Sequence, residues 1–282
     1  MNLLTFFRTL ILLIFTIQLT GCNGGSNNFA TNCSSEFSTS DATTNKSQQL
    51  YFIPDGKCIS NGRQSKSVKD VPFELSSVLE GFEVGNTARI QGDNGGAWIE
   101  VTNNTGQLYC SVGLQSLSYL DESGTELYAE SYPDLIGHLY DAGSYTRYDC
   151  LEDGDSGFIE AYGSYSTALA ENTAKLTANE LSAYTFTVTP VQNIEAGTMT
   201  WNGSSIRFEL TNTSNNTLNL ETLPAQAMYY DANYKPLESA YLNIEGTDLI
   251  ISPGQSFILS SIIAPSDPAY SVELMFTYDL AL

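Results

Sequence analysis

The stretch that decides the fold is WIEVTN at residues 98–103, because the chain returns to the same pattern with RFELTN at residues 207–212. In both copies apolar side chains alternate with polar ones, so that Ile99 and Val101 share one face of the first copy. This period of two is typical of a strand with one buried face. Each copy ends in a run of Asn, Ser, Thr and Gly residues, which indicates a turn.

The similarity continues beyond this strand. Residues 119–121 match residues 229–231 at a shift of 110, and Gly143 aligns with Gly254 at a shift of 111. Clusters of Gly, Asn, Asp and Ser separate many further short alternating stretches. This pattern favours antiparallel sheets, so we expect an all-β protein of two tandem sandwiches, each with about seven strands in roughly 90 to 100 residues.

Changes in composition set the expected boundaries. Residues 22–48 are mostly small and polar, which predicts a flexible tether. The first sandwich is expected over residues 49–165 and the second over residues 181–282. Residues 166–180, rich in Ala, Thr, Asn and Glu, predict a linker or a short helix between them.

Residues 1–21 have the layout of a secretory signal peptide, with Arg8 before an apolar run too short to span a bilayer. The run leads into LTGC at residues 19–22, which resembles the lipobox of bacterial lipoproteins. The resemblance implies cleavage before Cys22, lipid attachment to its thiol and a membrane anchor of several acyl chains. Asn23 in the next position implies sorting to the outer membrane of a Gram-negative cell.

The charge balance limits the partners. Acidic residues outnumber basic ones by 32 to 11, and the formal net charge is -21. Such a charge repels nucleic acid and anionic lipid, so neither is an expected partner. The sequence has one histidine, His138, although histidine is the commonest general base in enzymes. We expect no enzymatic activity and no cofactor.

The cysteines predict an oxidising compartment. With Cys22 assigned to lipid, four cysteines remain, an even number that predicts two disulfides. Four cysteines allow three pairings, and the repeat favours Cys33 with Cys58 and Cys110 with Cys150.

The alignment of the copies bears on the second of these bonds. Cys110 falls opposite Leu220 and Cys150 opposite Ser261, so the second copy lacks both cysteines together. Such a joint loss is expected of a bonded pair. A zinc site is not expected, because the chain has no Cys-x-x-Cys pair.

Two short motifs carry a family resemblance. Residues 117–121 with Gly124, and residues 227–231 with Asn233, each follow an Asn-containing turn, and the second copy adds Pro and Gly at 253–254. Together they resemble the FxLYD domains of bacterial lipoproteins. The resemblance implies immunoglobulin-like sandwiches and a non-catalytic, extracytoplasmic module.

Three aromatic residues are candidate ligand contacts. Trp98 neighbours Ile99 and is predicted to point outward, either as an exposed stacking surface or covered by another strand or by the second sandwich. Tyr145 and Tyr148 lie in a tyrosine-rich stretch that suits a polar binding face, although such tyrosines are also ordinary strand residues. Residues 152–155 form an acidic turn that we interpret as solvated, with calcium binding left open.

These observations predict a lipid-anchored, non-catalytic binding or scaffolding module of the bacterial envelope, held at the outer membrane by its N-terminal lipid and engaging a protein or glycan. The alternative is a cell-surface adhesive module that binds carbohydrate, assisted by calcium, through Trp98 and the tyrosines. A hydrolase built on a pair of acids is a third hypothesis.

Overall fold

The computed structural model describes residues 33, 36–44, 50–53, 56–63, 68–92, 95–135, 147–185, 188–189, 194–220, 225–246, 248–276 and 278–280. The chain separates into two compact units, residues 1–32 and 33–282, and all described residues belong to the second. Strands dominate these residues and α2 (Thr167–Asn172) is the one helix among them, so the expected all-β class is confirmed. Within the same residues no helix is long and apolar enough to cross a membrane.

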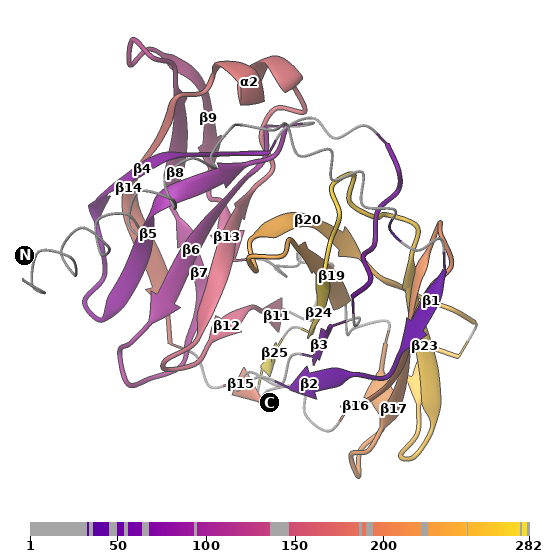
Figure 1. Cartoon of the computed structure of the whole chain (residues 1–282). Helices are drawn as coiled ribbons and strands as arrows, with labels where there is room; N and C mark the ends of the chain where they lie inside the picture. Colours follow the sequence, from indigo (N-terminus) through magenta and orange to yellow (C-terminus); the bar gives the residue numbers. More distant parts are fainter. Residues whose placement is uncertain are drawn as a thin grey trace, which may run out of the picture. The chain divides into compact units, whose positions relative to one another are not determined.

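The first half of this unit is a barrel made from one ten-stranded sheet, which can be followed in Figure 1. Its strands are β4 (Lys69–Ser77), β5 (Phe82–Ile90), β6 (Ala97–Asn103), β7 (Tyr109–Leu114), β8 (Ser116–Leu120), β9 (Glu126–Ser131), β10 (Asp134–Leu135), β12 (Cys150–Leu151), β13 (Ser156–Ala161) and β14 (Lys175–Tyr184). Because β7 pairs with both β10 and β14, seven strands close into a ring in the order β7-β10-β13-β6-β5-β4-β14. The strand β14 runs parallel to β4 and antiparallel to β7 and β8.

The barrel interior shows the alternation predicted for residues 98–103. Ile99 and Val101 on β6 are fully buried in the apolar core, whereas Glu100 between them is exposed. Tyr119 on β8 and Leu176 on β14 join the same core. Full burial of an aliphatic side chain contributes about 1.5 to 3 kcal/mol, so this interior is a main source of stability for the first half.

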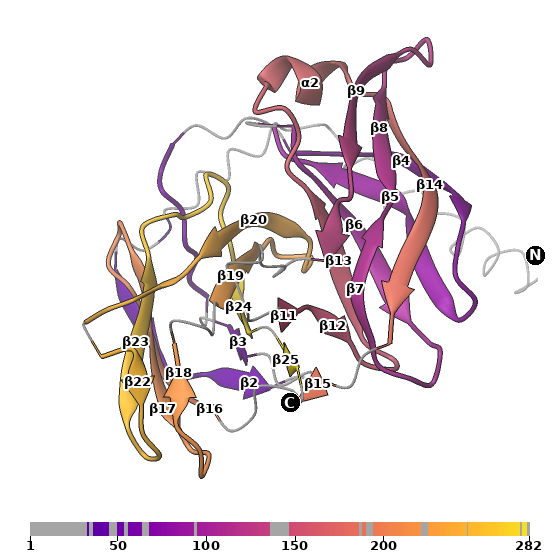
Figure 2. The same cartoon turned by 180° about the vertical axis from the view of Figure 1, so that it is seen from behind.

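The second half consists of two five-stranded sheets that enclose a separate core. Its strands are β1 (Phe37–Thr39), β2 (Ala42–Thr44), β3 (Leu50–Phe52), β16 (Ile194–Trp201), β17 (Ile206–Asn212), β19 (Ala225–Tyr230), β20 (Pro236–Tyr241), β21 (Asn243–Ile244), β23 (Ser256–Ser261) and β24 (Ser271–Phe276). One sheet has the order β1-β16-β17-β23-β21 and the other β2-β3-β24-β19-β20. Figure 2 shows this half from behind.

The N-terminal strands belong to the second half, although they precede the first half in sequence. The strand β1 pairs with β16, and β3 pairs with β24, which places Phe52 opposite Val272. Phe52 is fully buried, and its ring centroid lies 5.2 Å from that of Phe208. A further bridge joins Ile59 to Ala269.

This arrangement corrects two expected boundaries. Residues 36–44 lie in the segment predicted as a tether, residues 22–48, but they contribute β1 and β2. The first half, predicted to begin at residue 49, begins with β4, because β3 completes a sheet of the second half. The physical reason is that an open sheet edge offers unpaired backbone groups, and a short strand from any part of the chain can satisfy them.

The predicted linker is also corrected. Residues 166–180 form α2 and the first part of β14, a strand that hydrogen-bonds to three others of the barrel. The short-helix alternative is right for α2. Leu176 and Leu181 are fully buried on β14, so the first half extends to the end of this strand.

Each half has the same hydrogen-bonded turn after its central strand, which confirms the match of residues 98–103 with residues 207–212. Asn103 and Asn212 are both fully buried. The Nδ2 group of Asn103 donates to the carbonyls of Gln107 and Leu151, and that of Asn212 donates to the equivalent carbonyls of Asn216 and Ile251. A buried amide with its donors satisfied fixes the turn after each central strand.

One detail of the repeat was misaligned. Gly254 donates its N–H to the carbonyl of Asn212, and Gly154 donates to the carbonyl of Asn103. Gly154, and not Gly143, is therefore the structural counterpart of Gly254. The glycines differ from the predicted match because the connection before Cys150 in the first half is longer than its counterpart in the second.

Both predicted disulfides are present, Cys33–Cys58 and Cys110–Cys150. Cys110 and Cys150 lie directly opposite each other on β7 and β12. The equivalent short pair in the second half, β18 (Leu218–Asn219) and β22 (Ile250–Ile251), has Asn219 opposite Ile250. These residues, rather than Leu220 and Ser261, are the counterparts of the cysteines.

A small sheet also joins the two halves near the C-terminus. The strand β25 (Tyr278–Leu280) pairs with β11 (Arg147–Tyr148) and with β15 (Val188–Thr189). The end of the chain thus hydrogen-bonds to a segment between β10 and β12 of the barrel and to the connection between the halves.

The position of β3 gives a test of this chain path. Phe52→Ala is expected to lower the free energy of unfolding by about 3 to 5 kcal/mol, the usual cost of emptying a buried Phe site. Hydrogen exchange should show the loss of protection in β17 and β24, with β5 and β6 much less affected. Ile53→Ala, at a half-exposed neighbour, is the control. Equal loss of protection in both halves would contradict the path described.

Candidate functional site

The outer face of β6 packs against the second half. Trp98 is only 2% exposed and packs in a cluster with Met228, Tyr230 and Met275. The prediction that Trp98 turns away from the barrel core is therefore right, but the exposed stacking surface is wrong. The structure shows the alternative, in which the second half covers Trp98. Burial of a large apolar ring stabilises the protein because it removes apolar surface from water.

Polar contacts surround this apolar cluster. Arg89 on β5 forms an ion pair of 2.9 Å with Asp231, and both side chains are largely buried. Ser239 on β20 donates a hydrogen bond of 2.8 Å to Glu160 on β13. Burial raises the pKa of Glu160, while the hydrogen bond from Ser239 lowers it. These contacts fix how β20 lies against the barrel.

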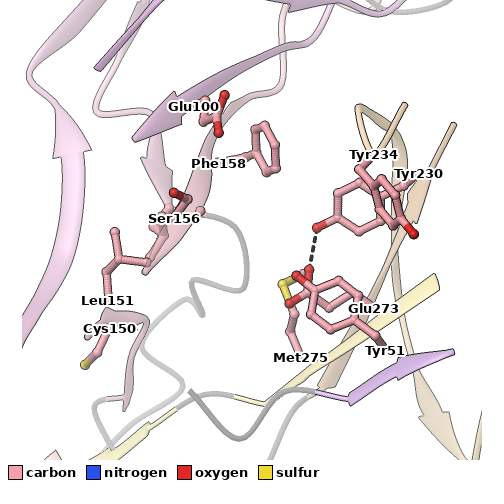
Figure 3. A pocket seen from close by; sticks show the side chains of 12 residues that line it. Tyr51, Glu100, Cys150, Leu151, Ser156, Phe158, Tyr230, Tyr234, Glu273 and Met275 are labelled. Atoms are coloured by element: carbon pink, nitrogen blue, oxygen red, sulfur yellow. Dashed lines mark hydrogen bonds between the residues drawn. The ribbon is translucent and has the colours of Figure 1, made fainter. Parts of the chain in front are cut away.

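A cavity of about 180 Å³ lies beside this interface. Figure 3 shows that Glu100 and Phe158 approach it from the first half, whereas Tyr51, Tyr230 and Glu273 face it from the second. The other lining residues are Leu135, Cys150, Leu151, Ser156, Gly157, Tyr234 and Met275. The site therefore combines side chains from strands that are far apart in sequence.

Glu273 is the chemically distinctive residue of the cavity. It lies on β24 and is 3% exposed. The hydroxyl of Tyr230 donates a short hydrogen bond to its Oε2 atom (Figure 3). Burial raises the pKa of Glu273 to about 7, although hydrogen bonding from Tyr230 and Tyr51 acts in the opposite direction, and Asp155 adds a smaller rise. The carboxyl can therefore change its charge near neutral pH.

A second cavity of about 300 Å³ adjoins the first and shares Glu100, Phe158 and Tyr234 with it. We call the two together the interhalf groove. Its second part also has Arg89 and Lys235 in its lining. Their charges are balanced locally, since Arg89 pairs with Asp231 and Lys235 pairs with Asp70 at 2.7 Å.

Tyr234 stands where the two parts of the groove meet. It belongs to the turn after β19, in which the Oδ1 atom of Asp231 accepts hydrogen bonds from the backbone N–H groups of Asn233 and Lys235. Its backbone has a φ of 57°, a left-handed value uncommon for a tyrosine, and its side chain is 59% exposed. The tight turn thus presents this ring to solvent at the groove.

Most of the remaining candidate residues lie outside the described part of the chain, whereas the acidic turn at 152–155 lies beside the first cavity, since Asp155 acts on Glu273. Cys22, His138 and Tyr145 lie outside the described residues. The backbone of Tyr148 is in β11, but its side chain is outside the description. In the acidic turn at 152–155, Asp153 accepts a hydrogen bond from Gly106 N–H, so this carboxylate has a structural role.

No group of three or more metal-ligating side chains occurs among the residues that the structure describes. Sequence reasoning missed Glu273, because one glutamate among 32 acidic residues gives no signal by itself. Its neighbours do give one, since SVELMF at residues 271–276 places a charge inside an apolar strand. No protein-family model matches this chain, and no curated protein matches it.

The first cavity offers two carboxyls, three phenols and a phenyl ring around a small space. Such a set suits binding of a polar or charged group against aromatic surface. Catalysis by a pair of carboxyls would need two acids placed on either side of a reacting bond. Glu100 is exposed whereas Glu273 is buried, so the two acids have very different surroundings.

The raised pKa of Glu273 predicts a change in stability with pH. Between 4.5, its ordinary pKa, and about 7, the folded state keeps a proton that the unfolded chain has released, so stability falls as the pH rises through this window. At about 1.4 kcal/mol per pKa unit the loss is about 3 kcal/mol. Glu273→Gln retains the shape of the protonated acid and should remove this loss.

Urea unfolding at several pH values from about 5 to about 8 measures the effect. The variant should gain stability relative to the natural protein as the pH rises, and the gain should level off above about pH 7 to 8. Glu209→Gln, at an exposed glutamate on β17, is the control and should show no such trend. Parallel curves for the natural protein and Glu273→Gln would rule out the raised pKa.

Proposed function

We propose that this protein is a lipid-anchored, non-enzymatic binding or scaffolding module of the bacterial envelope, exposed to an oxidising compartment. The interhalf groove carries the binding part of the proposal, because it is hollow, aromatic and formed only when both halves are in place. Concave sites at the junction of two folded bodies are where small ligands usually bind.

The strand order supports two tandem immunoglobulin-like sandwiches as the framework. Counted along the chain, β16-β17-β23-β21 has the order A-B-E-D of an immunoglobulin sheet, and β24-β19-β20 has the order F-C-C′. In the first half β5-β6-β13-β10 and β14-β8-β9 repeat both orders. In each half the place beside strand F, where G belongs, is taken by a strand that comes earlier in the chain, β4 or β3.

The two disulfides support the location. Stable disulfides form outside the reducing cytoplasm, and Cys33–Cys58 and Cys110–Cys150 use every cysteine except Cys22. The lipobox-like residues 19–22 leave that remaining cysteine for lipid. We therefore propose that the module is lipid-anchored at the outer membrane. Its resemblance to the FxLYD domains of bacterial lipoproteins agrees with this location.

The anchor has a direct test. Cys22→Ser is expected to move the protein from the membrane pellet to the soluble extracytoplasmic or secreted fraction, because without acyl chains little apolar surface remains for the bilayer. Fractionation followed by immunoblotting measures the distribution. Ser26→Ala, close by in sequence, should leave the protein in the pellet. Unchanged pelleting of Cys22→Ser after a salt wash would contradict the lipid anchor.

The groove can be tested in the intact envelope. A photoreactive benzoyl group placed at Tyr234 is expected to give a discrete covalent adduct on illumination, because this ring opens onto the groove. The matched control is Tyr165, which is also exposed and also has a positive φ but does not line the groove. Mass spectrometry identifies the adduct. Equal adducts at both positions, or none at either, would contradict binding in the groove.

A further inference from the structure

Three aromatic rings and the carboxyl of Glu273 line the first cavity of the interhalf groove. The ring centroid of Tyr230 lies 6.3 Å from that of Tyr51 and 6.2 Å from that of Phe158. The planes are tilted by 33° and 51°, so the rings are not stacked in parallel, and all three line the cavity. Figure 3 shows Glu273 between Tyr51 and Tyr230, with Phe158 on the other side of Tyr230.

The charges around this space have one sign. The described residues that line the first cavity include Glu100 and Glu273 and no lysine, arginine or histidine. Asp155 acts on Glu273 from nearby as a further negative charge. A buried carboxylate is stable only when it is paired or well hydrogen-bonded. Two tyrosine hydroxyls meet part of that need, and a positive ligand would meet the rest.

We infer that this cavity binds the head group of a small organic cation, an alkylammonium, with Glu273 as its counter-charge and the rings of Tyr51, Phe158 and Tyr230 as its walls. This inference rests on the proposed binding function and gives it a ligand class. Aromatic faces attract ammonium groups through their quadrupoles, and the attraction is strongest away from water.

The lining favours an organic cation over a metal ion. Calcium requires six to eight oxygen ligands, whereas this cavity offers Leu135, Leu151 and Met275 as well as the rings. Methyl and methylene groups on a nitrogen are accommodated by such apolar surface. The volume of about 180 Å³ corresponds to roughly six waters, which matches a head group of several heavy atoms.

The affinity should depend on pH in a defined direction. The groups that face Glu273 are the hydroxyls of Tyr51 on β3 and Tyr230 on β19, Asp155 before β13 and Glu100 on β6. An alkylammonium binds the ionised form of Glu273, so binding should strengthen as the pH rises from about 6 to about 8. Binding should in turn lower the pKa of Glu273, because the two equilibria are linked.

The test is a calorimetric titration of the full protein, purified in a nonionic detergent, with choline and with 3,3-dimethyl-1-butanol, its neutral carbon counterpart. Choline should bind at least about tenfold more tightly than the neutral alcohol, a difference of about 1.4 kcal/mol. Glu273→Gln should remove most of this preference. Phe158→Leu should weaken choline binding by about fivefold, since it removes one aromatic wall but retains an apolar one.

Glu209→Gln is the charge-matched control and should bind choline as the natural protein does. Circular dichroism of each variant separates lost binding from lost folding, and the second variant, Phe158→Leu, keeps the test valid if Glu273→Gln folds poorly. Equal affinity for choline and the alcohol, a preference that survives Glu273→Gln, or no binding of choline would overturn the inference. The adduct at Tyr234 would then still support a binding groove, with a ligand of another class.

Discussion

Every strand at the edge of a sheet presents backbone groups that require partners, and the whole architecture follows from how this chain supplies them. In the first half the strand β14 is paired by β4, which comes before the rest of that half. In the second half β24 is paired by β3, which comes before the entire first half. Each half is completed by a segment that precedes it.

The completion of each half by a preceding strand brings the two halves together. Since β3 lies in the second half and β4 in the first, and Val68 still packs against the second-half core, the chain enters the first half at β4 and leaves it after β14. The crossings keep the outer face of β6 close to β19 and β24, and Trp98 fills the space between them. The interhalf groove is what remains open beside this packed cluster.

The sequence predicted the local features well. Alternation in residues 98–103 fixed the buried face of β6, and the matching residues 207–212 located β17, because period-two patterns depend only on neighbours in the chain. Both disulfide pairings followed from cysteine counting together with the repeat. The turn at Asn103 was also predicted, since Asn in such a cluster has a local conformational preference.

Features that depend on distant partners were not predicted. The strands β1, β2 and β3 are three residues long and lie among polar residues, and what makes them strands is the open edge that they pair with. The cover over Trp98 comes from Met228 and Met275, more than a hundred residues later in the chain. Contacts of this kind are set by tertiary packing, which a single sequence does not encode in any short pattern.

The two halves differ in one way that bears directly on the site. In the first half β7 has six residues and reaches from β10 to β14, so the barrel closes on itself. Its counterpart β18 has two residues and, in the part of the chain that the structure describes, pairs only with β22, whereas the N-terminal strands β1 and β3 complete the sheets of the second half. Tyr51, which shares the carboxyl of Glu273 with Tyr230, lies on one of those strands. Detaching β3 would therefore remove the partner strand of β24 and a hydrogen-bond donor to Glu273 in the same step, so the pairing of β3 and the charge state of Glu273 are thermodynamically linked.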